Sequence, residues 1–131
     1  MRERRRVVVT GLGTLAPNGL STQAYWEALI DGRTAVDRIQ GFDATDFRVQ
    51  IGAELKGFDP EAFGMPRKDA RRNDRCTQYA VCSAKMAVED AGLDVDRWDS
   101  ERVGVIFGSG IGGLQTLEDQ HRVLLERGPG R

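Results

Sequence analysis

Two short apolar runs, each followed by a glycine-rich loop and then by a helix, constrain the fold of this chain most. Residues 5–10 read RRVVVT, and residues 102–107 read RVGVIF. Neither run alternates apolar with polar residues, so each is typical of a strand buried on both faces in a parallel sheet. With helices following them, these runs predict a layered α/β structure with a mainly parallel sheet.

A first helix is predicted soon after the first run. The loop that follows residue 10 contains three glycines and a proline, which delay the start of any helix. Ser21 or Thr22 can cap a helix that continues to Leu29 or Ile30, and Gly32 is a typical stop signal.

The middle of the chain combines a weak strand signal with a strong helix signal. Glycines and a proline break the pattern between residues 34 and 63, where only an edge strand at 49–55 is predicted. A longer helix then begins at Asp69 or Asn73 and continues through Ala91. Its residues 79–86 are apolar nearly all round apart from one serine and one lysine, which is typical of a buried helix.

Composition excludes the extreme classes of protein. The chain has 131 residues, a formal net charge of −1 and 40% hydrophobic residues, which fits one globular domain or part of a larger one. No stretch reaches the run of about 18 apolar residues that spans a bilayer, and residues 1–6 lack the apolar core of a secretory signal. We expect a cytoplasmic protein that binds no membrane.

Cysteine and histidine content argues against a metal site. Cys76 and Cys82 are six positions apart on the predicted helix, so they are turned about 240° from each other and share no face. They fit small buried hydrophobic residues in a reducing compartment. With His121 as the one histidine and no ligand motif, we expect no metal.

Charge is unevenly distributed along the chain. Residues 67–75 contain five basic and two acidic side chains, a local charge of +3. Residues 90–101 carry −4, so a general polyanion-binding surface and nucleic acid are not indicated. The basic segment is either an ordinary solvated helix face or a docking surface for one acidic partner.

Both glycine-rich loops imitate the dinucleotide-binding fingerprint. In the first, residues 11–16, the delayed helix start removes the helix amino terminus that would face a pyrophosphate. The second, GSGIGG at Gly108–Gly113, follows a predicted strand and precedes a helix from Leu114 to Glu126. A dinucleotide-binding module that uses Gly108 to Gly113 is therefore one hypothesis, and tight backbone packing is the other.

The last residues, ERGPGR, have the composition of a loop. Two central strands would lack neighbours on at least one side if nothing followed them. We therefore expect the chain to be part of a longer protein and to have poor stability on its own.

Three segments together resemble a known family. They are RRVVVTGLGTLAPNG, RKDARRNDRCTQYAVCSAKMAVEDAGL and GSGIGG, in that order along the chain. They are similar to the amino-terminal part of the β-ketoacyl-acyl-carrier-protein synthases, above all the elongating type II enzymes of bacterial fatty acid synthesis. The resemblance implies the thiolase-like fold, α/β/α/β/α in layers, of which residues 1–131 would form part of the amino-terminal half. It also implies a homodimer when full length.

The resemblance implies an acyltransferase without a cofactor. Such enzymes pass an acyl chain to a cysteine, decarboxylate malonyl on acyl carrier protein and join the two by Claisen condensation. Their cysteine and two histidines lie in later segments, so no catalytic residue is expected in this chain. Cys76 and Cys82 match non-catalytic positions of the family, and His121 stands in no catalytic motif.

Four positions are carried over as candidate binding residues. Ile111, in the middle of GSGIGG, matches the position that limits entry of acyl chains beside the cysteine. The alternative is that Ile111 packs against the next helix. Lys68, Arg71 and Arg72 match positions that present positive charge to acyl carrier protein, and Arg131 extends that surface.

Two related hypotheses stay open at this stage. Polyketide ketosynthases and chain-length factors share this half of the fold and differ mainly around the cysteine. A structural or docking fragment without chemistry is the other. The segment that follows this chain in a longer protein would distinguish them.

Overall fold

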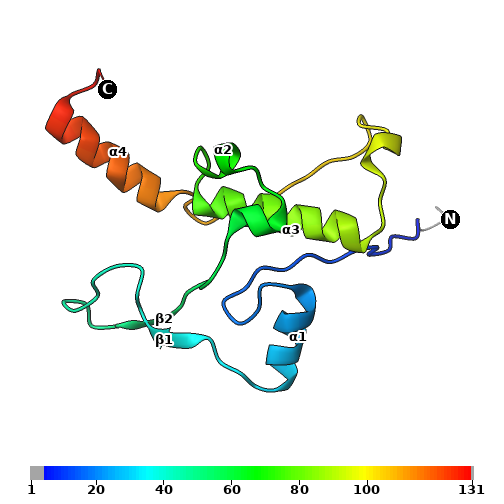
Figure 1. Ribbon diagram of the computed structural model, residues 1–131, viewed down its shortest axis with the longest axis horizontal. Helices are drawn as coiled ribbons and strands as arrows, with labels where there is room; N and C mark the ends of the chain where they lie inside the picture. The colour runs from blue at the N-terminus through cyan, green and yellow to red at the C-terminus, as the bar shows by residue number, and fades with distance from the viewer. Residues whose placement is uncertain (1–4, 131) are drawn as a thin grey trace. The chain divides into compact units, whose positions relative to one another are not determined.

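The computed structural model describes residues 5–130 (Figure 1). Contacts group these residues into two compact units. One unit contains the chain up to Phe58 together with residues 83–97, and the other contains residues 59–82 together with the chain from Trp98 onward. The elements in chain order are α1 (Thr22–Ile30), β1 (Val36–Arg38), β2 (Ile51–Ala53), the 3₁₀ helix η1 (Pro60–Phe63), α2 (Arg67–Ala70), α3 (Arg75–Asp90), the 3₁₀ helix η2 (Val95–Arg97) and α4 (Leu114–Arg127).

The first glycine loop packs directly on the second half of α3. A Cβ atom added to Gly13 would lie 2.7 Å from the backbone nitrogen of Ala87, and one added to Gly11 would lie 2.6 Å from that of Ala91. The backbone N–H of Leu12 donates a 2.8 Å hydrogen bond to a carboxylate oxygen of Asp90. These glycines therefore permit close contact between loop and helix.

The predicted first helix is confirmed as α1. The Ser21 hydroxyl oxygen accepts a 3.1 Å hydrogen bond from the backbone N–H of Ala24, as an N-cap does. At the other end Gly32 has φ +65°, and the N–H groups of Gly32 and Arg33 donate to Leu29 and Ala28. This Schellman arrangement satisfies carbonyl groups that the helix leaves without partners.

The long predicted helix is confirmed as α3, but it begins only at Arg75. Residues 67–70 form the separate short helix α2, which begins after Pro66. Cys82 is fully buried, as predicted for a small hydrophobic residue, and Cys76 is half-buried. Helix α3 ends at Asp90, one residue before the predicted end at Ala91, and Gly92 follows with φ +60°.

The second unit contains one helix that was predicted, α4, and one short helix that was not, η1. Helix α4 spans Leu114–Arg127, one residue beyond its predicted end. The 3₁₀ helix η1 was not predicted; the Asp59 side chain caps it by accepting from the N–H of Glu61 at 3.0 Å. In the part of the chain that the structure describes, no helix has the length and apolar character needed to cross a membrane.

Strands β1 and β2 form an antiparallel pair in which Val36 lies opposite Ala53. Strand β2 lies within the predicted edge strand at 49–55, whereas β1 reads VDR and has no apolar pattern that would predict it. The pair is held at one edge by Lys56, whose ammonium group lies 2.9 Å from the Asp37 carboxylate. Tertiary pairing, not local propensity, therefore forms β1.

Exposed carboxylates tie this hairpin to its own loop. The hydrogen bond from Lys56 lowers the pKa of Asp37 below its ordinary value, and the nearby ammonium charge adds to this. The pKa of Glu54 is lowered because its carboxylate accepts 2.8 Å hydrogen bonds from the backbone N–H groups of Gln40 and Gly41. The hydroxyl and backbone N–H of Thr45 lower the pKa of Asp43 in the same way.

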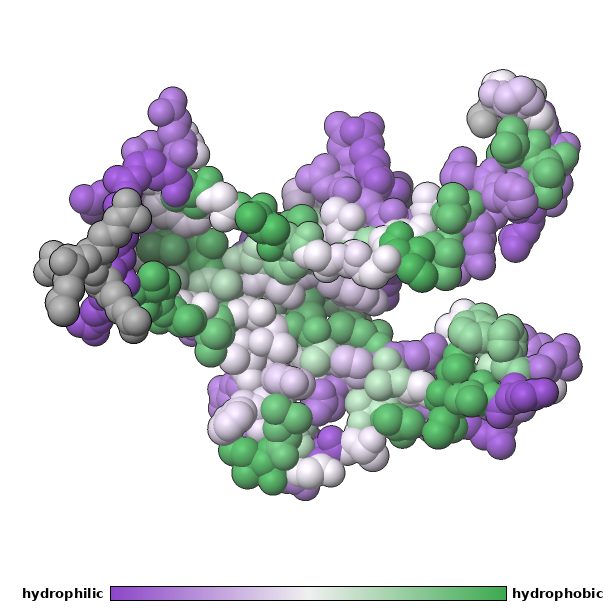
Figure 2. Space-filling model, turned by 180° about the vertical axis from the view of Figure 1, so that it is seen from behind, coloured by the Kyte–Doolittle hydropathy of each residue, from purple (hydrophilic) through white to green (hydrophobic). Residues whose placement is uncertain are grey.

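The prediction of two buried strands is wrong for this structure. Residues 5–10 and 102–107 are not strands, and the β1–β2 pair is the only sheet among residues 5–130. Val7 is 89% exposed and Ile106 is 96% exposed. A strand needs a neighbour for its backbone hydrogen bonds, and no described segment pairs with either run. Figure 2 shows that hydrophobic residues are widely open on the visible face.

Replacing Gly13 by alanine tests the contact between the first loop and α3. The new Cβ would collide with the helix backbone, so we expect the variant to lose about 1–3 kcal/mol of unfolding free energy through overpacking. The measurement is chemical denaturation. Gly130→Ala is the control, because its Cβ would meet nothing within 4 Å. Equal stability of both variants would contradict the packing role.

A pH titration tests the hairpin carboxylates. Their pKa values are lowered in the folded state, so their stabilising contribution is present above the ordinary values of 3.8 for Asp37 and 4.5 for Glu54. It is lost as the pH falls through the lowered values. In carboxyl-carbon NMR titrations, Lys56→Met should move the midpoint of Asp37 up toward 3.8 and leave that of Asp43 in place. An unmoved Asp37 midpoint would show that Lys56 is not the cause.

Candidate functional site

The predicted docking residues lie on or directly after the short helix α2. Lys68, Arg71 and Arg72 are all exposed, and none of the three forms an ion pair with another described residue. In contrast, the neighbouring Arg67 lies 3.7 Å from the Glu61 carboxylate. We call Lys68, Arg71 and Arg72 the basic patch. Among residues 5–130 its three charges have no carboxylate partner and are therefore open to an acidic one.

The buried side chain of Gln78 holds the segment that follows the basic patch. Its amide nitrogen donates to the carbonyl oxygens of Ala70 at 2.7 Å and Asn73 at 2.9 Å. Its amide oxygen accepts from Arg75 at 3.4 Å. Only 7% of this residue is exposed, so the hydrogen bonds compensate for its desolvation. Gln78 thereby fastens the connection between α2 and α3.

The GSGIGG turn presents one apolar side chain on an otherwise bare backbone. Ile111 is 76% exposed, and Gly112 has φ +83°, which a side chain would strain. The backbone N–H of Gly112 donates a 2.9 Å hydrogen bond to the Ser109 hydroxyl. Ile111 is therefore open on the surface of the described chain, and its role in limiting acyl chains stays a prediction.

A cavity of about 350 Å³ lies between the start of α3 and the start of α4. Both of its walls come from the second unit. Asp74 is half-buried, and its carboxylate accepts a hydrogen bond from the Thr116 hydroxyl. The lining residues are Asn73, Asp74, Arg75, Cys76, Gln78, Gly112, Gly113, Leu114, Gln115 and Thr116. The fold therefore brings the end of the GSGIGG turn to the segment that follows the basic patch.

Sequence reasoning missed the residues that make this connection. Asp74 was counted only as a charge, and Gln78 only as part of a family pattern. Thr116 was not singled out at all. The one available signal was Gly113, since a glycine directly before a helix indicates close approach of another group. Nothing in the sequence indicated which group that is.

The remaining candidates do not form a second site. Cys76 lines the cavity, Cys82 is buried in α3, and His121 is exposed on α4. Arg131, which was expected to extend the basic patch, lies outside the described residues.

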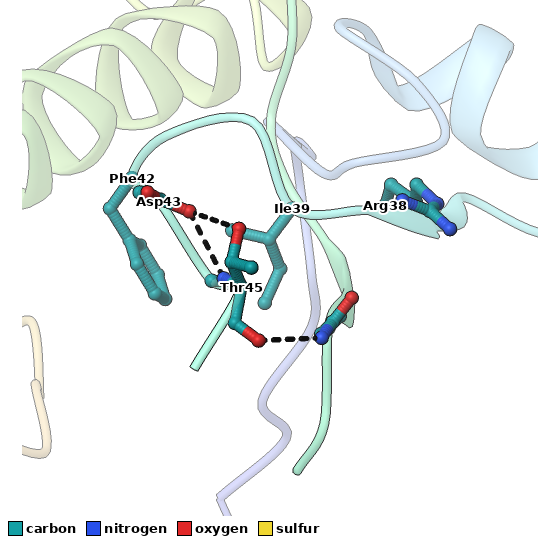
Figure 3. A pocket seen from close by; sticks show the side chains of 7 residues that line it. Arg38, Ile39, Phe42, Asp43 and Thr45 are labelled. Atoms are coloured by element: carbon teal, nitrogen blue, oxygen red, sulfur yellow. Dashed lines mark hydrogen bonds between the residues drawn. The ribbon is translucent and has the colours of Figure 1, made fainter. Parts of the chain in front are cut away.

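A smaller cavity, of about 130 Å³, lies in the loop of the hairpin in the first unit (Figure 3). Three of its polar side chains or backbone groups are joined by hydrogen bonds, at Asp43, Thr45 and Gln50. Thr45 donates to the Asp43 carboxylate at 2.6 Å from its hydroxyl, and the Gln50 amide donates to the Thr45 carbonyl oxygen at 3.0 Å. The rings of Phe42 and Phe47 pack edge to face, with their centroids 5.6 Å apart, and stabilise the loop. These contacts give the loop its shape.

Comparison with known proteins identifies the family. The model of the β-ketoacyl synthase N-terminal domain matches residues 4–129. This chain belongs to the β-ketoacyl synthase family. The match includes Gly108–Gly113, so the sequence support for a dinucleotide-binding module at that loop is removed.

Among curated relatives of this family member is the 3-oxoacyl-[acyl-carrier-protein] synthase 2 of Synechocystis sp.. The two are 45% identical over 129 residues, which is 98% of this chain and 31% of the relative. The chain therefore spans about a third of the length of such synthases.

Solved ketosynthases share the backbone of this β-ketoacyl synthase domain. The ishigamide ketosynthase/chain length factor matches with a TM-score of 0.76 and 30% identity over 96% of this chain and 31% of that one. A type II polyketide ketosynthase, in complex with its acyl-carrier protein and bound to the hexaketide, gives the same TM-score and identity over 96% and 33%. These matches confirm the predicted thiolase-like fold class.

Proposed function

We propose that this chain is the amino-terminal part of a 3-oxoacyl-[acyl-carrier-protein] synthase, with residues 1–131 forming part of the first thiolase-like half. The observation that carries the proposal is 45% identity to such a synthase over 98% of the chain. The exposure of the runs at 5–10 and 102–107 supports it, because apolar β-branched segments open to water gain stability when further sheet covers them.

The reaction proposed for the whole protein joins two thioesters. An acyl group is transferred from carrier protein to a cysteine sulfur, which releases the carrier thiol. Malonyl on a second carrier loses carbon dioxide, and the resulting carbanion attacks the acyl carbon. The carbon–sulfur bond to the cysteine breaks as the new carbon–carbon bond forms, giving 3-oxoacyl carrier protein and free thiol. This chain contributes binding groups and no catalytic residue to these reaction steps.

We propose that the basic patch docks acyl carrier protein. Its three cations are exposed and have no carboxylate partner in the described part of the chain, which supports attraction to an acidic protein. Such rim charges mainly accelerate encounter and fix orientation, and their effect weakens as salt screens them. The acyl-carrier protein seen with the related polyketide ketosynthase supports the same class of partner.

We propose that Ile111 limits the length of the acyl chain. Its side chain is the only one larger than a hydroxymethyl group between Gly108 and Gly113, and it is open on the surface of the described chain. A single branched side chain on a bare turn can block or admit an acyl chain according to its size.

A polyketide ketosynthase or chain-length factor is the second candidate for the whole protein. Structural likeness to both kinds favours it, with a TM-score of 0.76 in each case. The higher identity to the fatty acid enzyme supports the first proposal. We further propose that the full-length protein is a cytoplasmic homodimer.

An assay of the full-length protein tests the proposal. Purified enzyme, acyl carrier protein loaded with a saturated acyl chain, and malonyl carrier protein should produce 3-oxoacyl carrier protein and carbon dioxide in equal amounts. Mass spectrometry should show the acyl group on one enzyme cysteine other than Cys76 and Cys82. Failure to form either the acyl-enzyme or the product would reject the synthase function.

Enlarging Ile111 tests the acyl-chain limit. In the full-length enzyme Ile111→Phe should block acylation by medium and long chains while sparing short ones, because the larger ring fills the chain's path. Acyl-enzyme formation is measured by mass spectrometry with primers of increasing length. Leu114→Phe, three positions away at the start of α4, is the matched control. Unchanged acylation by long primers in Ile111→Phe would remove the role.

Reversing charge tests the docking surface. Lys68→Glu with Arg71→Glu should raise KM for carrier-protein substrates by about tenfold, since each reversed rim charge repels the acidic partner. Activity with coenzyme A thioesters should stay nearly intact. Arg33→Glu with Arg48→Glu, exposed arginines of the first unit, is the control. An equal loss with both kinds of substrate would point to misfolding and contradict docking.

A further inference from the structure

The backbone of Asp74 is held firmly at the start of α3. Its carbonyl oxygen accepts a 2.9 Å hydrogen bond from the N–H of Gln78, the first bond of the helix. The side chain of the same Gln78 binds the carbonyl oxygen of the preceding Asn73 at 2.9 Å. One buried glutamine therefore holds the peptide groups on both sides of the Asp74 Cα, from which the carboxylate projects.

The carboxylate of Asp74 points toward the start of α4. Its partner there, Thr116, lies 42 residues further along the sequence. It accepts a hydrogen bond from the Thr116 hydroxyl, and it lies so close to Gly113 that a Cβ atom there would collide with it. Helix α4 has no acidic residue in its first turn, and its N-cap residue, Gly113, has no side chain that could accept a hydrogen bond from the helix. Asp74 supplies the negative charge that a helix amino terminus favours.

The start of α4 is also the end of the GSGIGG turn. Ile111 stands two residues before Gly113, and the N–H of Leu114 donates a 3.0 Å hydrogen bond back to the carbonyl oxygen of Gly112. Cβ atoms added to Gly108, Gly110 or Gly112 would meet nothing within 4 Å. Of the four glycines in the turn, Gly113 is the one where an added Cβ would meet another segment, the side chain of Asp74.

We propose that Asp74 is a positioning residue for acyl-chain selection, acting through Thr116 and Gly113 to hold Ile111 in place. This inference rests on the proposed function, because it needs Ile111 at the acyl pocket. Glycine-rich backbone has high conformational freedom, so an unanchored turn would let Ile111 move aside. A hydrogen bond to a carboxylate is stronger than one between neutral groups, which makes it an effective anchor.

The test measures chain-length selection in the full-length synthase. Thr116→Val keeps the shape of the side chain, removes the hydroxyl donor and changes no charge. We expect the ratio of kcat/KM for long-chain to short-chain acylation to rise by about fivefold or more, the effect of losing about 1 kcal/mol of anchoring. KM for carrier protein should stay unchanged. Asp74→Ala should act in the same direction.

Two controls separate positioning from general damage. Thr116→Ser retains the donor and should keep the wild-type ratio, and Glu118→Gln removes one exposed charge from α4 and should do the same. In an Ile111→Ala background the side chain to be positioned is absent, so Thr116→Val should then leave the ratio unchanged. Such non-additivity is expected only if the two residues act together.

The outcomes distinguish failure of this inference from failure of the proposed synthase function on which it rests. If the wild-type enzyme forms no acyl-enzyme, the synthase proposal fails. If Ile111→Phe alters chain length but Thr116→Val leaves the ratio within twofold, the gate stands and the role of Asp74 is rejected. An equal change in the Ile111→Ala background would also reject it, because the effect would not pass through Ile111.

Discussion

Close approach of glycine backbone to another segment is the constraint on which the described structure depends. In the first unit Gly11 and Gly13 lie against the backbone of α3, where a side chain would collide. In the second unit Gly113 lies against the carboxylate of Asp74, directly before α3. Both glycine-rich motifs look like nucleotide fingerprints in the sequence, yet both are contact surfaces. The first motif packs against helix α3. The second packs against the Asp74 carboxylate, whose negative charge favours the positive end of the α4 dipole.

Few hydrophobic side chains of the described residues are buried, and many large ones are exposed. The buried apolar side chains of the described residues are Ala28, Ala44, Phe58, Met65 and Cys82. Valine, isoleucine and phenylalanine side chains in the runs at 5–10 and 102–107 stay open to water. At about 25 cal/mol per Å² of apolar area, covering them would stabilise the chain substantially. This balance agrees with a chain that spans 31% of a related synthase and is proposed to act within one.

The candidate site divides in the same way between local and distant contacts. Exposure of Lys68, Arg71 and Arg72 was predictable, because a dense run of cations cannot be desolvated without partners. The bare turn around Ile111 was also readable from its glycines. The link between these two surfaces was not predictable, because the Asp74 carboxylate contacts Thr116, which lies 42 residues away in sequence. Thr116 looks like any helical threonine until its partner is known.

By itself, the sequence determined both ends of α1, the region where α3 ends, and the family to which the chain belongs. Ser21, Gly32 and Gly92 cap or stop helices through hydrogen bonds that reach only a few residues, so local sequence suffices. Only tertiary structure decided that β1 forms, that residues 5–10 and 102–107 are unpaired, and that Asp74 meets α4. Strand pairing and side-chain contacts across 42 residues depend on which backbone lies alongside, and no short stretch of sequence contains that information.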